Sequence, residues 1–105
     1  MLLIIIFSII FNIFISHNLK VIAQDNVWLS TGNLLKQKGN YTGAIAAYNR
    51  ALEIDTNYVN AWDGKGWALN ELGNYTQAIS YLNKALEIDP NNELAKRIYN
   101  NLIKK

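Results

Sequence analysis

The sequence contains no cysteine, one proline and one histidine, and each scarcity excludes a class of chemistry. Without cysteine, the chain has no disulfide framework, no thiolate metal ligand and no thiol nucleophile. The only histidine is His17, which belongs to an N-terminal apolar stretch. The rest of the chain therefore lacks imidazole, which excludes Ser-His-Asp and Cys-His catalysis and the usual Cys/His zinc sites. We expect no catalytic residue, no cofactor and no bound metal.

Charge is also scarce and nearly balanced, with ten Lys and Arg residues against eight Asp and Glu residues and a net charge of +2. Because this small excess forms no basic stripe, the sequence does not indicate a nucleic-acid-binding surface. The length of 105 residues is sufficient for one small domain. These properties favour a binding or structural protein over an enzyme.

An apolar leader precedes this domain, and residues 2–15 read LLIIIFSIIFNIFI. A run of this length falls within the roughly 7–15 residues of a signal-peptide core and is shorter than the roughly 20 residues of a membrane-spanning helix. Small or short side chains at Val21, Ile22 and Ala23 predict cleavage before Gln24. We predict that residues 1–23 direct the chain to the membrane and are absent from the folded module, as a cleaved signal peptide in preference to a retained anchor.

The charges around the leader support the alternative, a retained membrane anchor. A signal peptide begins with positive charge, whereas Lys20 here follows the apolar run. If the segment is retained, the positive-inside rule places Lys20, Lys36 and Lys38 on the cytoplasmic side. The sequence thus predicts an exported or membrane-attached protein and leaves open on which side of the membrane it lies.

From residue 25 onward the sequence repeats with a period of 34 residues. Residues 25–58 and 59–92 align without a gap and are identical at 17 of 34 positions. Such a period with helical patterning indicates helix–turn–helix units that stack on one another. Residues 93–105 continue the register as a capping helix, in which Lys96 and Asn100 replace the Trp and Gly of the units. We predict an all-α fold, a short α-solenoid preceded by the hydrophobic leader.

Glycine and threonine positions predict the helix ends. Gly39 and Gly73 are expected to take a positive φ after the first helix of each unit. Thr42 and Thr76 are expected to N-cap the second helices.

Glycines inside the first helices need a separate reason, because glycine there costs about 1 kcal/mol relative to alanine. We expect Gly32 and Gly66 to allow close approach of the facing helices, which carry Ala44 and Ala78, while a neighbouring Trp fills the volume.

The repeated residues resemble the tetratricopeptide repeat family, whose pattern is Trp-x2-Leu-Gly-x2-Tyr, then Ala-x3-Phe, then Ala and Pro. The first unit matches this pattern at Trp28, Gly32, Ala44, Tyr48 and Ala51. The second unit matches it at Trp62, Gly66, Ala78, Ala85 and Pro90, with Leu82 at the Phe position. The sequence departs from the family at Thr31 and Lys65, where the family prefers Leu. The resemblance covers residues 25–92.

This resemblance implies a concave groove, lined by the first helix of each unit, that binds a protein or peptide partner. By register, the partner-binding residues are Leu29, Asn33, Asp63, Trp67, Asn70 and Arg97. Trp67 corresponds to Asn33 one period earlier, so its position is not a core position shared by both units. We therefore expect Trp67 either to anchor a partner or to fold against the capping helix.

Two further expectations concern the partner. The family members that clamp a C-terminal carboxylate of heat-shock chaperones use Lys, Asn and Arg at fixed positions, and only Asn33 matches here; the other positions are Leu29, Gly64, Leu94 and Ile98. The sequence therefore excludes that clamp and leaves the ligand class open. The alternative function is a structural piece that associates with itself or with other repeat proteins, because stable solenoids usually need at least three repeats.

Overall fold

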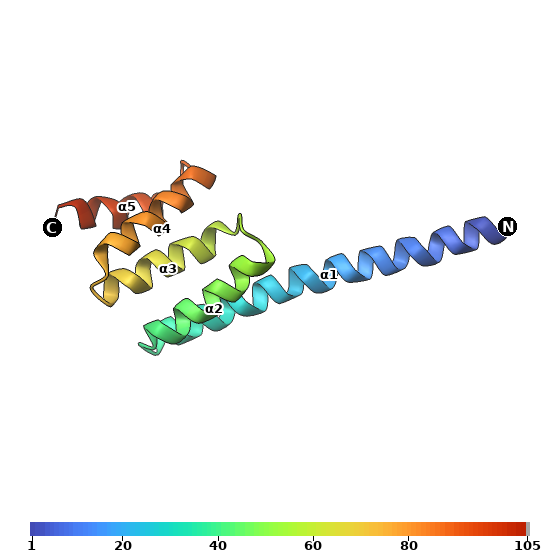
Figure 1. Ribbon diagram of the computed structural model, residues 1–105, viewed down its shortest axis with the longest axis horizontal. Helices are drawn as coiled ribbons and strands as arrows, with labels where there is room; N and C mark the ends of the chain where they lie inside the picture. The colour runs from blue at the N-terminus through green and yellow to red at the C-terminus, as the bar shows by residue number, and fades with distance from the viewer. Residues whose placement is uncertain (105) are drawn as a thin grey trace.

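The computed structural model describes residues 1–104, except for the side chains of residues 19–23 and 25. In this part of the chain there are five α-helices and no strand. The helices are α1 (Leu2–Gln37), α2 (Tyr41–Ile54), α3 (Val59–Glu71), α4 (Tyr75–Ile88) and α5 (Glu93–Ile103). Each helix runs back along the one before it, so that α2 to α5 and the end of α1 form one stack (Figure 1). The predicted all-α solenoid is confirmed.

The first helix, α1, is much longer than the others and projects from the stack (Figure 1). It has no break near residue 23, so the predicted leader and the first helix of the repeat are one continuous helix. The large hydrophobic side chains of residues 2–15 are 39–81% exposed. Lys20 and the predicted cleavage motif at residues 21–23 lie outside the described side chains. None of the helices, over the residues that the structure describes, is long and apolar enough to cross a membrane.

The turns within the two units have the predicted backbone but different caps. Gly39 and Gly73 have φ angles of 79° and 83°, as expected. The predicted threonine caps are wrong, because α2 and α4 begin two residues earlier than those caps imply and place Thr42 and Thr76 inside the first turn. Asn40 caps α2 instead, and its Oδ1 accepts a hydrogen bond of 2.9 Å from the backbone N–H of Gly43.

Two clusters of buried side chains hold the stack together. The first joins α2 to α3 and contains Ala44, Tyr48, Ala51, Leu52 and Ala61. The second joins α3, α4 and α5 and contains Leu69, Ala78, Leu82, Ala85, Ala95, Ile98 and Leu102. Trp62 packs against both clusters and so connects the two units.

The interior glycines contact larger side chains than the sequence predicted. A Cβ atom on Gly32 would lie 2.5 Å from the Tyr48 ring, and one on Gly66 would lie 2.7 Å from Cγ of Leu82. The expected close approach of backbones is present at Gly66, where the same Cβ would lie 3.4 Å from the carbonyl oxygen of Ala78. The volume beside these glycines is thus filled by Tyr48 and Leu82 of the second helices. The prediction that a neighbouring Trp fills this volume is wrong.

Lys65, which stands where the family prefers Leu, is 7% exposed. Its Nζ lies 3.8 Å from the centroid of the Tyr81 ring and 5.3 Å from that of the Trp62 ring. The two rings stack on each other at 5.6 Å. The aliphatic stem thus packs like a leucine, while the ammonium interacts with the negative faces of two aromatic rings.

Candidate functional site: the concave groove

Residues of α1, α3 and α5 line two neighbouring hollows, which we call the inner hollow and the outer hollow and which together form the groove. The inner hollow has a volume of about 310 Å³ and the outer hollow about 560 Å³. Trp67 lines both of them. The inner hollow is completed by Asn33, Lys36, Gln37, Asn60, Asp63, Gly64 and Leu94. The outer hollow is completed by Asn70, Glu71, Arg97, Ile98, Asn101 and Lys104.

Trp67 is held in place from two sides. Its ring meets the ring of Tyr41 edge-on, with centroids 5.5 Å apart and an interplanar angle of 67°. Nζ of Lys36 lies 4.9 Å from the centroid of the Trp67 ring. The half-buried side chain also packs against the second core cluster. Trp67 therefore lines the groove and packs against the second core cluster, and its role as an anchor for a partner stays a prediction.

Asn33 is oriented by a buried tyrosine. The hydroxyl of Tyr48 donates a hydrogen bond of 2.6 Å to Oδ1 of Asn33. Burial raises the pKa of Tyr48 to about 12, so the hydroxyl keeps its proton and remains a donor at neutral pH. Because its amide oxygen is engaged in this way, Asn33 has its NH2 group left to donate to a ligand in the inner hollow.

Asp63 is 4% exposed and links α3 to the start of α5. Its Oδ2 accepts a hydrogen bond of 2.6 Å from Nδ2 of Asn92, and Oδ1 of Asn92 caps α5 by accepting from the N–H of Ala95. Oδ1 of Asp63 has no hydrogen-bond partner within the described part of the chain. Burial raises the pKa of Asp63, and the Asp89 carboxylate adds to this, whereas the Asn92 hydrogen bond and Lys36 lower it.

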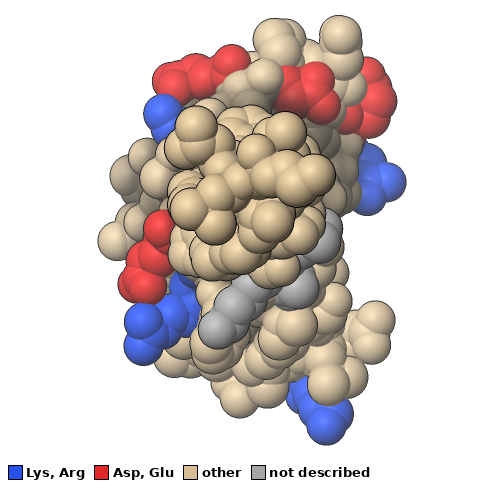
Figure 2. Space-filling model, turned by 90° about the vertical axis from the view of Figure 1, so that its right-hand side faces the viewer, with Lys and Arg blue, Asp and Glu red and all other residues tan. Residues whose placement is uncertain are grey.

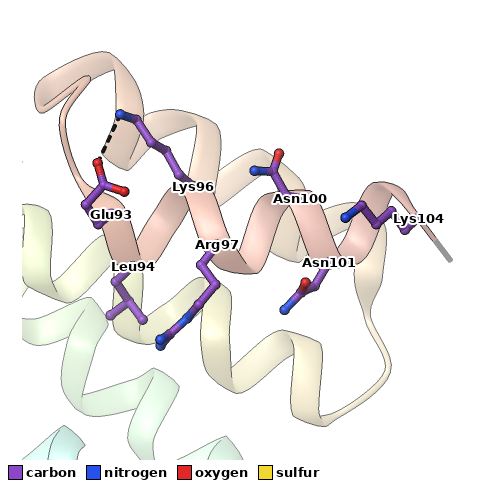
Figure 3. Close-up of a pocket in the computed structure, with 7 residues that line it drawn as sticks. All are labelled: Glu93, Leu94, Lys96, Arg97, Asn100, Asn101 and Lys104. Carbon is purple, nitrogen blue, oxygen red and sulfur yellow. Dashed lines mark hydrogen bonds and ion pairs between the residues drawn. The ribbon is translucent and has the colours of Figure 1, made fainter.

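The wall formed by α5 supplies cations to the groove. Figure 3 shows Leu94, Arg97 and Asn101 on the side of α5 that faces α3, while Lys96 turns toward Glu93. Arg97 is exposed and forms no hydrogen bond or ion pair with any described residue. Oδ1 of Asn70, on the opposite wall, is buried and also lacks a hydrogen-bond partner among these residues. The outer hollow thus combines donors and acceptors that are not used within the chain.

The structure places five of the six predicted residues around the hollows. The exception is Leu29, which packs against the first core cluster and lines neither hollow. Sequence reasoning missed Lys36 and Lys104, although each lies one period of 34 residues from Asn70. Across the described residues, no group of three or more His, Cys, Asp or Glu side chains could hold a metal ion. The groove therefore offers hydrogen bonding and aromatic contact to a ligand.

Solved structures with a similar fold are tetratricopeptide repeat domains. The first TPR of Spaghetti (RPAP3), bound to the HSP90 peptide SRMEEVD, has a TM-score of 0.74 and 19% identity over 76% of this chain. The TPR2B-domain:pHsp70 complex of yeast Sti1 has a TM-score of 0.74 and 22% identity over 76% of this chain. The present chain covers 64% of each of these two chains. The second TPR domain of human RPAP3, in complex with the HSP70 peptide SGPTIEEVD, has a TM-score of 0.52 and 18% identity over 77% of this chain and 99% of that one.

At these identities the likeness shows the fold, and the family is shown by the sequence itself. No curated protein matches the chain. The family model described as "Tetratricopeptide repeat" matches residues 29–93, which is more than half of the sequence. The chain therefore belongs to the tetratricopeptide repeat family.

Proposed function

We propose that this chain is a non-catalytic interaction module that binds a protein or peptide partner in its concave groove. The observation that carries the proposal is the position of Trp67, which lines both hollows and is flanked by polar groups that the fold leaves available. A half-buried Trp near Arg is the composition of a binding hot spot. The similar TPR domains of Spaghetti and human RPAP3 are bound to peptides, which supports a peptide as the ligand here.

The chemistry of the groove favours a peptide other than a clamped chaperone terminus. Of the clamp positions, Leu29 packs against the first core cluster, Gly64 contacts Tyr48 and Ile98 is buried in the second cluster. None of these three supplies the polar side chain that a terminal carboxylate requires. The groove instead offers an aromatic surface at Trp67 and a guanidinium at Arg97. These two groups favour an extended segment that places an apolar side chain on Trp67 and a hydrogen-bond acceptor beside Arg97.

Replacing Trp67 with alanine tests the groove. Peptides selected by display on the wild-type chain are expected to bind Trp67→Ala more weakly by about 2 kcal/mol, or about 30-fold in dissociation constant. The physical reason is the loss of the aromatic surface that Trp67 presents to both hollows. Calorimetric titration measures the change, at a temperature where circular dichroism shows both proteins folded.

Leu72→Ala is the matched control, because Leu72 is 45% exposed and lines neither hollow. This variant should bind the selected peptides with wild-type affinity. Unchanged affinity of Trp67→Ala, or selection of peptides that Leu72→Ala fails to bind, would contradict the groove as the binding site.

We further propose that the chain is exported or membrane-attached through residues 1–23, with a cleaved signal peptide favoured over a retained anchor. Support comes from the twelve large apolar side chains of residues 2–15, which are exposed all round the projecting part of α1. Burying each such side chain is favourable by about 1.5–3 kcal/mol, so water is a poor environment for this segment. Lipid or the signal-sequence binding site of the export machinery provides an apolar alternative.

Fractionation of cells that produce the chain tests this second part. We expect the protein either to float with membranes at full length or to appear outside the cell with Gln24 as its first residue, as read by N-terminal sequencing. A variant lacking residues 2–15 should remain in the soluble cytosolic fraction. Recovery of the full-length wild-type chain in that fraction would contradict both the signal and the anchor.

A second candidate function is structural: the chain pairs with copies of itself or with other repeat proteins. The observation that favours it is the uncovered outward face of α1, where Val27 and Leu34 are 61% and 51% exposed.

A further inference from the structure

The outward face of α1, which points away from α2 and α3, corresponds to a surface that is covered in the second unit. It is a shallow, largely apolar hollow lined by Asn26, Val27, Ser30, Thr31 and Leu34. One period later, Val27 and Leu34 correspond to Ala61 and Ala68 of α3, which are fully buried. Ala61 belongs to the cluster in which α2 packs against α3. The outward face of α1 is thus the position at which the repeat architecture receives another helix.

The polar atoms of this face are largely satisfied within the chain. The Thr31 hydroxyl donates a hydrogen bond of 2.8 Å to the carbonyl oxygen of Val27, so that its methyl group is available for packing. Oδ1 of Asn26 accepts a hydrogen bond of 2.8 Å from the Tyr58 hydroxyl. No lining residue of the face carries a charge. Two copies of the face can therefore meet without opposing like charges.

The other end of the stack does not fit this face. On α5, Lys96 and Asn100 occupy the positions where Trp62 and Gly66 of α3 pack against α4. Lys96 is paired with Glu93 at 3.3 Å, and Asn100 is exposed. Head-to-tail association would place these polar groups against Val27 and Leu34 and cost their hydration. The face is better matched by an identical face than by the end of another stack.

We propose that two copies of the chain pair through the outward faces of their α1 helices, side by side and in the same direction. The proposal deepens the structural candidate above and does not depend on peptide binding in the groove. A two-fold axis along the helices relates the copies, so that Val27 meets Val27 and Leu34 meets Leu34 of the second copy. Ser30 lies between them and, being small, allows the helices to approach to about 8–10 Å.

In the uncleaved chain, the direction of pairing follows from the projecting part of α1. Ile6, Ile13, Val27 and Leu34 are separated by multiples of seven residues, and all are 45–64% exposed. These four side chains lie along one stripe of α1, and in a parallel pair each faces its counterpart in the second copy, as side chains do at the a positions of a parallel, left-handed coiled coil. In an antiparallel pair, Ile6 and Ile13 would have no counterpart.

The view along α1 shows where charged side chains lie relative to the end of this helix. Figure 2 looks toward the module from the N-terminal end of α1, and the end-on helix at the front carries no Lys, Arg, Asp or Glu among its coloured atoms. Charged side chains lie around it at the periphery.

Disulfide crosslinking tests the pairing, because the chain has no cysteine of its own. The full chain in a mild detergent carries one cysteine at a time, as Ile13→Cys, Val27→Cys or Leu34→Cys, and is treated with a copper oxidant. A disulfide requires Cα atoms within about 7 Å, which the seam of a parallel pair provides at each of these positions. We expect covalent dimers of all three variants and none of Ser80→Cys, the matched control on the exposed face of α4.

A mixture of the Val27→Cys and Leu34→Cys variants distinguishes a parallel from an antiparallel arrangement of the two α1 helices. Crosslinking only between the two different variants would show an antiparallel pair and overturn the proposal. Light scattering of the uncrosslinked wild type should give a dimer mass, and a strict monomer across the concentration range would overturn the proposal as well.

Leu34→Glu should raise the dimer dissociation constant by at least about tenfold, because it opposes like charges at the seam. The same variant should bind groove peptides normally, so that failure of pairing and failure of the groove are distinguishable.

Discussion

Replacing Gly66 with leucine is expected to unfold the second repeat unit. A Cβ at this position would already lie 2.7 Å from Cγ of Leu82 and 3.4 Å from the Ala78 carbonyl oxygen, so a larger side chain forces α3 away from α4. Overpacking of this kind typically costs about 1–3 kcal/mol, which is a large part of the stability of a domain this small. Thermal unfolding followed by circular dichroism should show a much lower melting temperature or no cooperative transition.

Two further variants separate steric overlap from other effects of leucine at this position. Ala46→Leu adds the same side chain on the exposed face of α2 and should leave the melting temperature nearly unchanged. Combining Gly66→Ala with Leu82→Ala should cost less than the sum of the two single changes, because the second change removes the atoms that the first would meet. Wild-type melting of Gly66→Leu would show that α3 and α4 do not pack in the observed register.

A second large effect is expected at high pH. Burial raises the pKa of Tyr48 from 10.0 to about 12, so between these values the unfolded chain releases the phenolic proton while the folded chain keeps it. The unfolded state then binds fewer protons, and the folded state loses stability as pH rises through this range. A shift of this size corresponds to at most about 2–3 kcal/mol. Urea unfolding at pH 8 and near pH 12 measures the loss.

Tyr48→Phe isolates this contribution. The variant loses the hydrogen bond to Asn33 and is expected to be less stable at pH 8 by about 1 kcal/mol. Its stability should nevertheless decrease less between pH 8 and 12 than that of the wild type, because the buried phenol is gone. If the free energy of unfolding of the two proteins depended equally on pH, Tyr48 would not be the cause of the stability lost at high pH.

The helical architecture was predictable because it depends on local sequence patterns and because these patterns occur in both repeat units. The period of 34 residues places the turns at Gly39 and Gly73, and both adopt the positive φ that only glycine takes readily. The caps were not predictable with the same certainty, since Asn40 and Thr42 are both good N-cap residues and only the start of α2 distinguishes them. Local patterns therefore identify helices better than their first residues.

The contacts of the groove depend on tertiary packing, which the repeat does not encode. Register placed Asp63 and Arg97 on the groove-lining helices, but the hydrogen bond of Asp63 to Asn92 joins the first helix of the second unit to the residue that caps α5. The same limit applies to Trp67, whose contact with Tyr41 arises only when α3 packs beside α2. Lys36 is a different case, because strict use of the period would have predicted it from Asn70.

The unbroken course of α1 has a mechanical consequence. The projecting part of α1 and the groove wall belong to one helix. The direction in which the groove opens is therefore fixed relative to the side chains of the projecting part. One residue inserted near residue 18 would rotate the groove by about 100° and advance it by about 1.5 Å. Seven inserted residues would return it to within about 20° of its original direction. In the uncleaved chain, whatever surrounds residues 2–15 therefore also determines the direction in which the groove opens.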